Sequence, residues 1–167
     1  MKYLLLSALF ALLLASCSTQ RYYIVRHAEK AAVTGNAASM SSTDPPLTAK
    51  GKQRAEDLKN LMQSKKIGYI FATNTIRAKE TVAPTSAYFG LTTMIYPPMP
   101  DSAFITRLQE LKKNTLIAGH SNTVDDIVNK LTGKNILSDL PETEYNHLFL
   151  VTRKGKKWKL QSLFYGE

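Results

Sequence analysis

The sequence predicts one α/β domain, a three-layer sandwich with a mainly parallel sheet, helices on both faces and a C-terminal antiparallel hairpin. Three observations predict it. Short apolar runs, typical of buried strands, alternate with segments of helical hydrophobic spacing. The last two strand-like segments follow each other around a Gly-Lys turn. The 167 residues suit a single domain with a sizeable core, and no internal repeat is visible.

The parallel strands are expected at four short apolar runs. These runs cover residues 22–27, 68–73, 92–96 and 115–120. The first and the last end in the same way, on His27 and His120, and the chain has only three histidines. Ligands of such sheets bind outside the carboxyl ends of the strands. We therefore expect both histidines in one site.

A helix is expected after each of these strands. The expected helices cover residues 48–64, 77–89, 102–113 and 121–133. Thr48 is a suitable N-cap for the first, and Ser121 or Asn122 for the last. Pro84 lies inside the second, where we expect a kink or a break because proline has no N–H to donate. Gly133 is expected to end the last helix.

The C-terminal hairpin is expected from strands at residues 147–152 and 158–165. The basic residues between and within them are read as a solvated face of this hairpin. His147 begins the first of these strands and is interpreted as structural. Trp158 is expected in the core or facing a membrane, not in a catalytic role.

The N-terminal residues 1–16 have the pattern of a secretory signal peptide. A basic start is followed by an apolar run too short to span a bilayer, and then by small residues. Leu14-Ala15-Ser16-Cys17 resembles the lipobox of bacterial lipoproteins, whose cysteine becomes the lipidated first residue. The alternative is a signal cleaved nearby, with Cys17 incidental. We expect an exported protein on the periplasmic or cell-surface face of a bacterial membrane.

The predicted lipid anchor at Cys17 is followed by a short tether over residues 17–21 and a domain over residues 22–167. The four residues after Cys17 span at most about 13 Å when extended. We therefore expect the domain to lie close to the membrane. Because the chain has one cysteine, it cannot form an intramolecular disulfide.

The formal net charge of +9 limits the expected partners. A basic surface attracts anionic substrates or anionic lipid headgroups. Nucleic acid is not expected, because the chain is predicted to be exported and has no recognition motif. We expect a monomer.

Three strand-to-helix junctions are predicted to meet at one edge of the sheet. The first presents Arg26 and His27, the second Arg77 and the third His120. Guanidinium groups match phosphate oxygens in bidentate fashion. Gly119, directly before His120, allows close approach of the backbone. The charges at this edge predict an anion site.

Four segments of the chain carry a family resemblance. They are residues 26–30 (RHAEK), 46–55 (PLTAKGKQRA), 75–82 (TIRAKETV) and 118–121 (AGHS). In the same order, they resemble the Arg-His-Gly, Pro-Leu-Thr-x-x-Gly-x-x-Gln-Ala, Arg-Ala-x-x-Thr-Ala and Gly-His elements of the histidine phosphatase superfamily, the phosphoglycerate mutase-like proteins. The second segment has one residue inserted before Ala55. The resemblance runs from Tyr22 to about Thr152.

Two departures from the family pattern narrow the expectation. Ala28 replaces the usual glycine, and Lys30 replaces the serine or threonine common in the mutases. The large insertions of the mutases are also missing from this sequence. The resemblance therefore implies a short phosphatase, a phosphomonoester hydrolase, in preference to a mutase.

The resemblance assigns roles to the four residues of the predicted anion site. His27 would be the nucleophile that forms a phosphohistidine intermediate, which splits hydrolysis into two steps. Arg26, Arg77 and His120 would bind the phosphoryl oxygens and stabilise the transition state. With this much fixed positive charge, no metal and no cofactor are expected. His27 needs a neutral nitrogen, whereas His120 is expected to work best with a proton.

The general acid for the leaving oxygen is expected to be Asp101. In the family it is a carboxylate between the second arginine and the second histidine, and Asp101 follows a strand and a stiff proline turn at the sheet edge. Glu110, on a helix face, and Glu80, one turn into a helix, are the less favoured choices.

Three further residues are candidates for substrate binding: Glu29, Ser121 and Asn122. Glu29 can line the pocket mouth, form a solvated pair with Lys30, or pair with Arg26. Ser121 and Asn122 can bind phosphate at a helix N-terminus or act only as helix caps. The loop over residues 31–42 is expected to shape one side of the pocket.

Two rival functions stay open at this point. One is a non-catalytic lipoprotein that holds a phosphorylated ligand on the same fold. The other is a phosphotransferase of the phosphoglycerate mutase type. A phosphohistidine protein, a sugar phosphate and a nucleotide all remain as candidate ligands, because nothing in the sequence distinguishes them.

Overall fold

A computed structural model describes residues 19–32 and 44–166 of the chain. The predicted signal peptide, the predicted lipidation site at Cys17 and most of the loop over residues 31–42 lie outside these residues. No helix in the described part of the chain is long and apolar enough to cross a bilayer. The described strands and helices run from Thr19 to Phe164.

The structure contains the mixed six-stranded sheet that the sequence predicts. Its strands are β1 (Thr19–Arg26), β2 (Ile67–Thr73), β3 (Thr93–Tyr96), β4 (Asn114–Gly119), β5 (His147–Lys154) and β6 (Lys157–Phe164). They lie in the order β3-β2-β4-β1-β5-β6. The first four strands are parallel, and β5 and β6 add an antiparallel hairpin beside β1.

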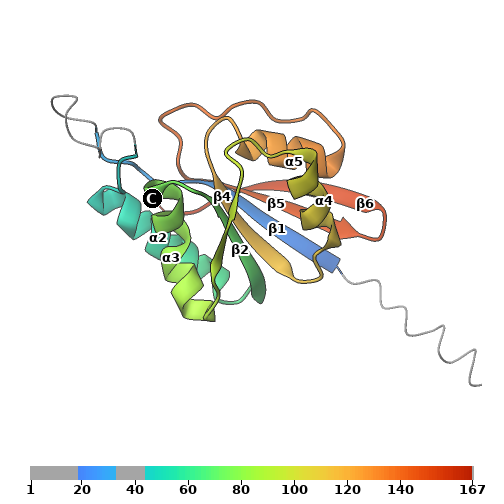
Figure 1. Cartoon of the computed structure of the whole chain (residues 1–167), viewed down its shortest axis with the longest axis horizontal. Helices are drawn as coiled ribbons and strands as arrows, with labels where there is room; N and C mark the ends of the chain where they lie inside the picture. Colours follow the sequence, from blue (N-terminus) through green and yellow to red (C-terminus); the bar gives the residue numbers. More distant parts are fainter. Residues whose placement is uncertain (1–18, 33–43, 167) are drawn as a thin grey trace, which may run out of the picture.

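Two layers of helices cover the sheet, which confirms the three-layer architecture (Figure 1). The helices are α2 (Ala49–Met62), α3 (Ile76–Phe89), α4 (Ser102–Glu110) and α5 (Val124–Thr132). One buried cluster joins α2 and α3 to one face of the sheet, through residues such as Leu58 and Val82. A second cluster joins α4 and α5 to the other face, through Leu108 and Ile127.

Local sequence signals explain most of the helix ends. The side chains of Thr48 and Thr75 cap α2 and α3 by accepting hydrogen bonds from the N–H groups of Gly51 and Ala78. Gly90 and Gly133 end α3 and α5 in the left-handed conformation that glycine adopts without strain.

Three expectations about the helices need correction. The break expected at Pro84 is not found, because α3 continues through this residue to Phe89. The helix expected over residues 102–113 ends at Glu110, and Leu111 is already extended. The N-cap position of α5 belongs to Thr123 and not to Ser121 or Asn122, and the Thr123 hydroxyl accepts a hydrogen bond from the His120 N–H at 2.9 Å.

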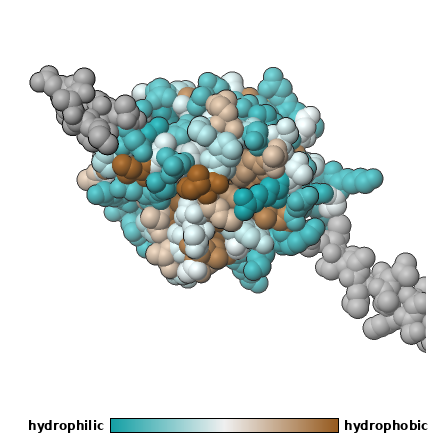
Figure 2. All heavy atoms as spheres, viewed as in Figure 1, coloured by the Kyte–Doolittle hydropathy of each residue, from teal (hydrophilic) through white to brown (hydrophobic). Residues whose placement is uncertain are grey.

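The C-terminal residues close the sheet face that α2 covers. The hairpin of β5 and β6 turns at Gly155, and the chain then returns to α2 (Figure 1). Arg54 of α2 donates hydrogen bonds to the carbonyl oxygens of Tyr165 and Gly166. On the face that Figure 2 shows, hydrophilic residues dominate the surface and hydrophobic residues are exposed in small patches.

Candidate active site

The pairing of β1 with β4 brings the two strand-ending histidines together. Arg26 lies opposite Gly119 in the parallel register, so His27 and His120 leave the sheet side by side. The backbone N–H of His27 donates to the Gly119 carbonyl oxygen at 2.8 Å. The two imidazole rings lie edge to face, with 5.3 Å between their centroids.

His27 is held in one tautomer. Its Nδ1 lies 2.8 Å from the carbonyl oxygen of Ala28. Because a carbonyl oxygen can only accept, Nδ1 carries the proton and Nε2 keeps its lone pair. The side chain is 2% exposed, and this burial, with smaller contributions from the neighbouring cations, lowers the pKa of His27 from 6.5 to about 3. His27 is therefore neutral at physiological pH, with Nε2 available.

The backbone around His27 is fixed by a buried threonine of α3. Thr81 is fully buried, and its hydroxyl accepts a hydrogen bond from the Ala28 N–H at 2.9 Å and donates to the Arg77 carbonyl oxygen at 2.8 Å. Thr81 therefore connects two parts of the site: Ala28, whose carbonyl oxygen orients the His27 ring, and the backbone of Arg77.

Arg26 is buried beneath the loop that precedes β5. Its guanidinium donates to the carbonyl oxygens of Pro141 and Glu144 and to the Glu142 carboxylate, at 2.8, 3.1 and 3.0 Å. The Tyr145 ring lies over it, 4.3 Å from the guanidinium carbon. Its ion-pair partner is therefore Glu142, and not Glu29 as one interpretation of the sequence proposed.

Arg77 enters the site from the first turn of α3. Its Nη1 donates to the Asp44 carboxylate at 3.1 Å, and Asp44 also accepts from the backbone N–H of Ile76. The Nε–H groups of Arg77 and Arg26 are both buried without a hydrogen-bond partner among the described residues.

His120 is oriented by threonines at the end of β2 and the start of α5. Its Nε2 lies 2.8 Å from the Thr73 hydroxyl, and its backbone N–H donates to Thr123. Burial first, and then the charges of Arg77 and Arg26, lower the pKa of His120 to about 4. We expected His120 to carry a proton. At neutral pH it is instead neutral, because burial and then the two arginines disfavour its positive charge.

Asp101 occupies the N-cap of α4, and its carboxylate accepts a hydrogen bond from the Phe104 N–H at 2.7 Å. No hydrogen bond or ion pair in the described residues joins it to the two histidines or the two arginines. The carboxylates that do contact the site arginines are Asp44 and Glu142. The role of Asp101 as general acid stays a prediction.

The predicted substrate-binding residues have separate surroundings. Glu29 forms a two-pronged ion pair with Arg54 of α2, at 2.9 and 2.8 Å. Burial has the largest single effect and would raise the pKa of Glu29, but the hydrogen bonds from Arg54 and the backbone, together with the charges of Arg54 and Lys50, lower this pKa overall. Ser121 donates to the Glu142 carboxylate at 2.8 Å, at the mouth of the site, and Asn122 is exposed beside it.

Sequence reasoning missed Asp44, Glu142 and Tyr145. All three lie in irregular segments, where no periodicity predicts which residue faces a site. Glu142 and Tyr145 lie just before the strand predicted to begin at His147, and Asp44 lies just before the segment at residues 46–55, but neither position indicates a role in the site. Among the described residues, no group of three or more His, Cys, Asp or Glu side chains is arranged to hold a metal ion.

Comparison with known proteins agrees with this geometry. The family model described as histidine phosphatase superfamily (branch 1) matches residues 22–99, which include Arg26, His27 and Arg77. A search of curated proteins finds no match. Over residues 22–99 the chain is therefore similar to the histidine phosphatase superfamily, and the described fold agrees with that similarity.

Solved structures with the same fold include proteins of several activities. The protein histidine phosphatase SixA complexed with tungstate is 20% identical, with a TM-score of 0.66 over 86% of this chain and 96% of that one. The alpha-ribazole phosphatase from Shigella flexneri is 17% identical, with a TM-score of 0.64 over 86% and 96%. Phosphoglycerate mutase from Bacillus anthracis str. Sterne is 12% identical, with a TM-score of 0.59 over 88% and 93%. These likenesses establish the fold, and with the family match they support phosphatase or mutase chemistry.

Proposed function

We propose that this protein is a phosphomonoester hydrolase that works through a phosphohistidine on His27. The observation that carries the proposal is the hydrogen bond from His27 Nδ1 to the Ala28 carbonyl oxygen. It leaves Nε2 unprotonated in a ring that burial keeps neutral. A neutral imidazole nitrogen beside two arginines is the arrangement that nucleophilic attack on a phosphoryl group needs.

The proposed reaction has two steps. The lone pair of Nε2 attacks phosphorus, the bond from phosphorus to the leaving oxygen breaks, and that oxygen takes a proton. Water then attacks the phosphohistidine, the P–N bond breaks, and inorganic phosphate leaves with His27 neutral again. Arg26, Arg77 and His120 stabilise the charge on the transferring group, and loss of one such donor costs roughly two to three decades in rate.

We propose that this chemistry needs no metal ion, because the two guanidinium groups supply the positive charge. The leaving oxygen receives its proton from Asp101 or from water. Replacing Asp101 by asparagine separates these two sources. Hydrolysis of alkyl phosphates should slow while hydrolysis of p-nitrophenyl phosphate, whose leaving group needs no proton, should continue if Asp101 is the acid.

The test is hydrolysis of p-nitrophenyl phosphate by a chain of residues 18–167, in the presence of a metal chelator. We expect turnover that His27→Ala abolishes. Gln53→Ala is the control, because Gln53 is exposed on α2 and hydrogen-bonds to Asp57 away from the site, so this variant should keep its activity. Binding of phosphate without turnover would favour the non-catalytic alternative. Turnover that depends on a bisphosphorylated primer would favour a mutase.

We also propose that the mature protein is anchored in a bacterial membrane by lipid on Cys17. The pattern of residues 1–17 supports this proposal. In a bacterial host fed labelled palmitate, the full chain should carry label and sediment with membranes. Cys17→Ser should lose both properties. Equal labelling of the two chains would contradict the proposal.

A further inference from the structure

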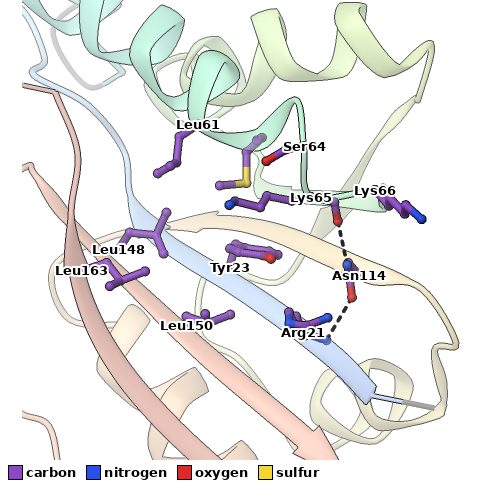
Figure 3. A pocket seen from close by; sticks show the side chains of 11 residues that line it. Arg21, Tyr23, Leu61, Ser64, Lys65, Lys66, Asn114, Leu148, Leu150 and Leu163 are labelled. Atoms are coloured by element: carbon purple, nitrogen blue, oxygen red, sulfur yellow. Dashed lines mark hydrogen bonds between the residues drawn. The ribbon is translucent and has the colours of Figure 1, made fainter.

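A pocket lies between α2 and the sheet, and two of its polar lining residues lie at the ends of β1 and β4 that are away from the histidines. It has a volume of about 490 Å³, within the range of ligand sites. Arg21 near the start of β1 and Asn114 at the start of β4 line it, whereas His27 and His120 follow the ends of these strands (Figure 3). The pocket is therefore separate from the candidate active site.

One side of this pocket is apolar. The hairpin of β5 and β6 extends the sheet beyond the cluster that α2 and α3 cover, so a hollow is left between the hairpin and the end of α2. Leu148, Leu150 and Leu163 of the hairpin and Leu61 of α2 gather on this side of the pocket, as Figure 3 shows. Leu163 is 38% exposed, although it is a large aliphatic residue. Such exposed apolar surface favours a ligand with a hydrocarbon part.

The other side of the pocket is cationic. Arg21, Lys65 and Lys66 line it, and none of the lining residues is acidic. None of the three forms an ion pair with the described residues, whereas Lys50, Lys59 and Lys130 elsewhere in the chain do. In Figure 3 the ammonium end of Lys65 points into the pocket, above the Tyr23 ring. A positive charge held beside apolar walls attracts an anion more strongly than one surrounded by water.

We propose that this pocket binds a single-chain anionic amphiphile, a hydrocarbon chain that ends in a carboxylate or a phosphate. The chain would lie against Leu61, Leu150 and Leu163. The anionic group would pair with Lys65 and Arg21. This inference does not depend on the proposed phosphatase activity, because no residue of the pocket belongs to the candidate active site.

The test is calorimetric titration of residues 18–167 with dodecanoate below its micelle concentration. Three probes separate the two features of the ligand: dodecanoate, dodecyltrimethylammonium with the same chain and the opposite charge, and butanoate with the same charge and a short chain. We expect saturable one-to-one binding of dodecanoate alone. The double variant Arg21→Glu and Lys65→Glu should weaken it at least about tenfold, as expected for loss of hydrogen bonds to a charged group.

Two further variants keep the test decisive. The first is the double variant Lys154→Glu and Lys156→Glu at the hairpin turn. It changes the net charge by the same amount as Arg21→Glu with Lys65→Glu, and it should leave dodecanoate binding unchanged. Leu163→Asn should weaken binding without changing the fold seen by circular dichroism, because Leu163 is on an edge strand and already partly exposed.

Three results would overturn the proposal. Equal weakening by the two charge variants would assign the effect to the overall basic surface. Equal binding of dodecanoate and dodecyltrimethylammonium would show that the cations do not select the ligand. If the protein bound only to vesicles that contain anionic phospholipid, and not to monomeric dodecanoate, the basic residues would act by attraction to a membrane surface and not by binding a ligand in the pocket. Loss of activity in His27→Ala has no bearing on any of these measurements.

Discussion

The buried state of His27 predicts how the stability of the protein depends on acid. His27 has a folded-state pKa of about 3, against 6.5 for an ordinary histidine. Below the unfolded-state pKa, the unfolded chain binds a proton that the folded protein does not bind. Stability that is fully present above pH 6.5 is therefore lost as the pH falls toward the folded-state pKa.

The size of this effect follows from the two pKa values. Between about pH 7 and about pH 5 this position in the unfolded chain goes from about one quarter protonated to almost fully protonated, which lowers the free energy of unfolding by about 2 kcal/mol. The side chain is 2% exposed, so solvent screening calls for no reduction. The carboxylates titrate alike in the wild-type chain and in His27→Gln, so their contribution cancels in the difference.

The assay is urea unfolding of residues 18–167 and of His27→Gln at both pH values. The wild-type chain should lose about 2 kcal/mol more than the variant on acidification. Equal losses in the two chains would refute the conclusion that His27 is buried in the neutral state. His120→Gln should show an effect of the same sign and nearly the same size over this pH range, because a folded-state pKa of about 4 also leaves His120 largely unprotonated at pH 5.

Three more substitutions test the surroundings of the site. Thr81→Val removes the acceptor for the buried Ala28 N–H, so chemical unfolding should show a loss of about 1–3 kcal/mol in the free energy of unfolding. The kcat should fall as well. An unchanged kcat would show that Thr81 does not help to position His27. Gly51→Ala places a methyl group against the Glu29 backbone, and thermal unfolding should show a lower Tm; no change in Tm would mean that α2 shifts without cost. Glu142→Gln removes the negative charge beside Arg26, and with it a weak repulsion between Glu142 and a bound phosphate. Product inhibition should therefore show about threefold tighter binding of inorganic phosphate. Weaker binding would show that Glu142 supports the site.

The fold could be predicted because its signals are local. The apolar runs marked the four parallel strands, and Thr48 and Gly133 marked helix ends at the correct residues. Pro84 shows the limit of such signals, because a helix packed against a sheet tolerates a missing hydrogen bond that would break it in isolation. Thr123 was missed as the N-cap position because its hydroxyl contacts His120 and not the helix.

The candidate site could be predicted only in part. The strand ends placed His27 and His120 correctly, since parallel register follows from the alternation of strands and helices. The partners of Arg26 could not be predicted, because residues 141–145 are an irregular loop more than a hundred residues away in the sequence. The depressed pKa of His120 was also missed, because it depends on burial and on the joint charge of two arginines.

The most direct test of the central claim is the position of the phosphoryl group on the trapped intermediate. The chain labelled with ¹⁵N in its histidines can be quenched during turnover of a phosphomonoester and examined by ³¹P–¹⁵N correlation. Because Nδ1 of His27 donates to the Ala28 carbonyl oxygen, we predict phosphorus bonded to Nε2 of His27. Phosphorus bonded to Nδ1, or to a residue other than His27, would contradict the account.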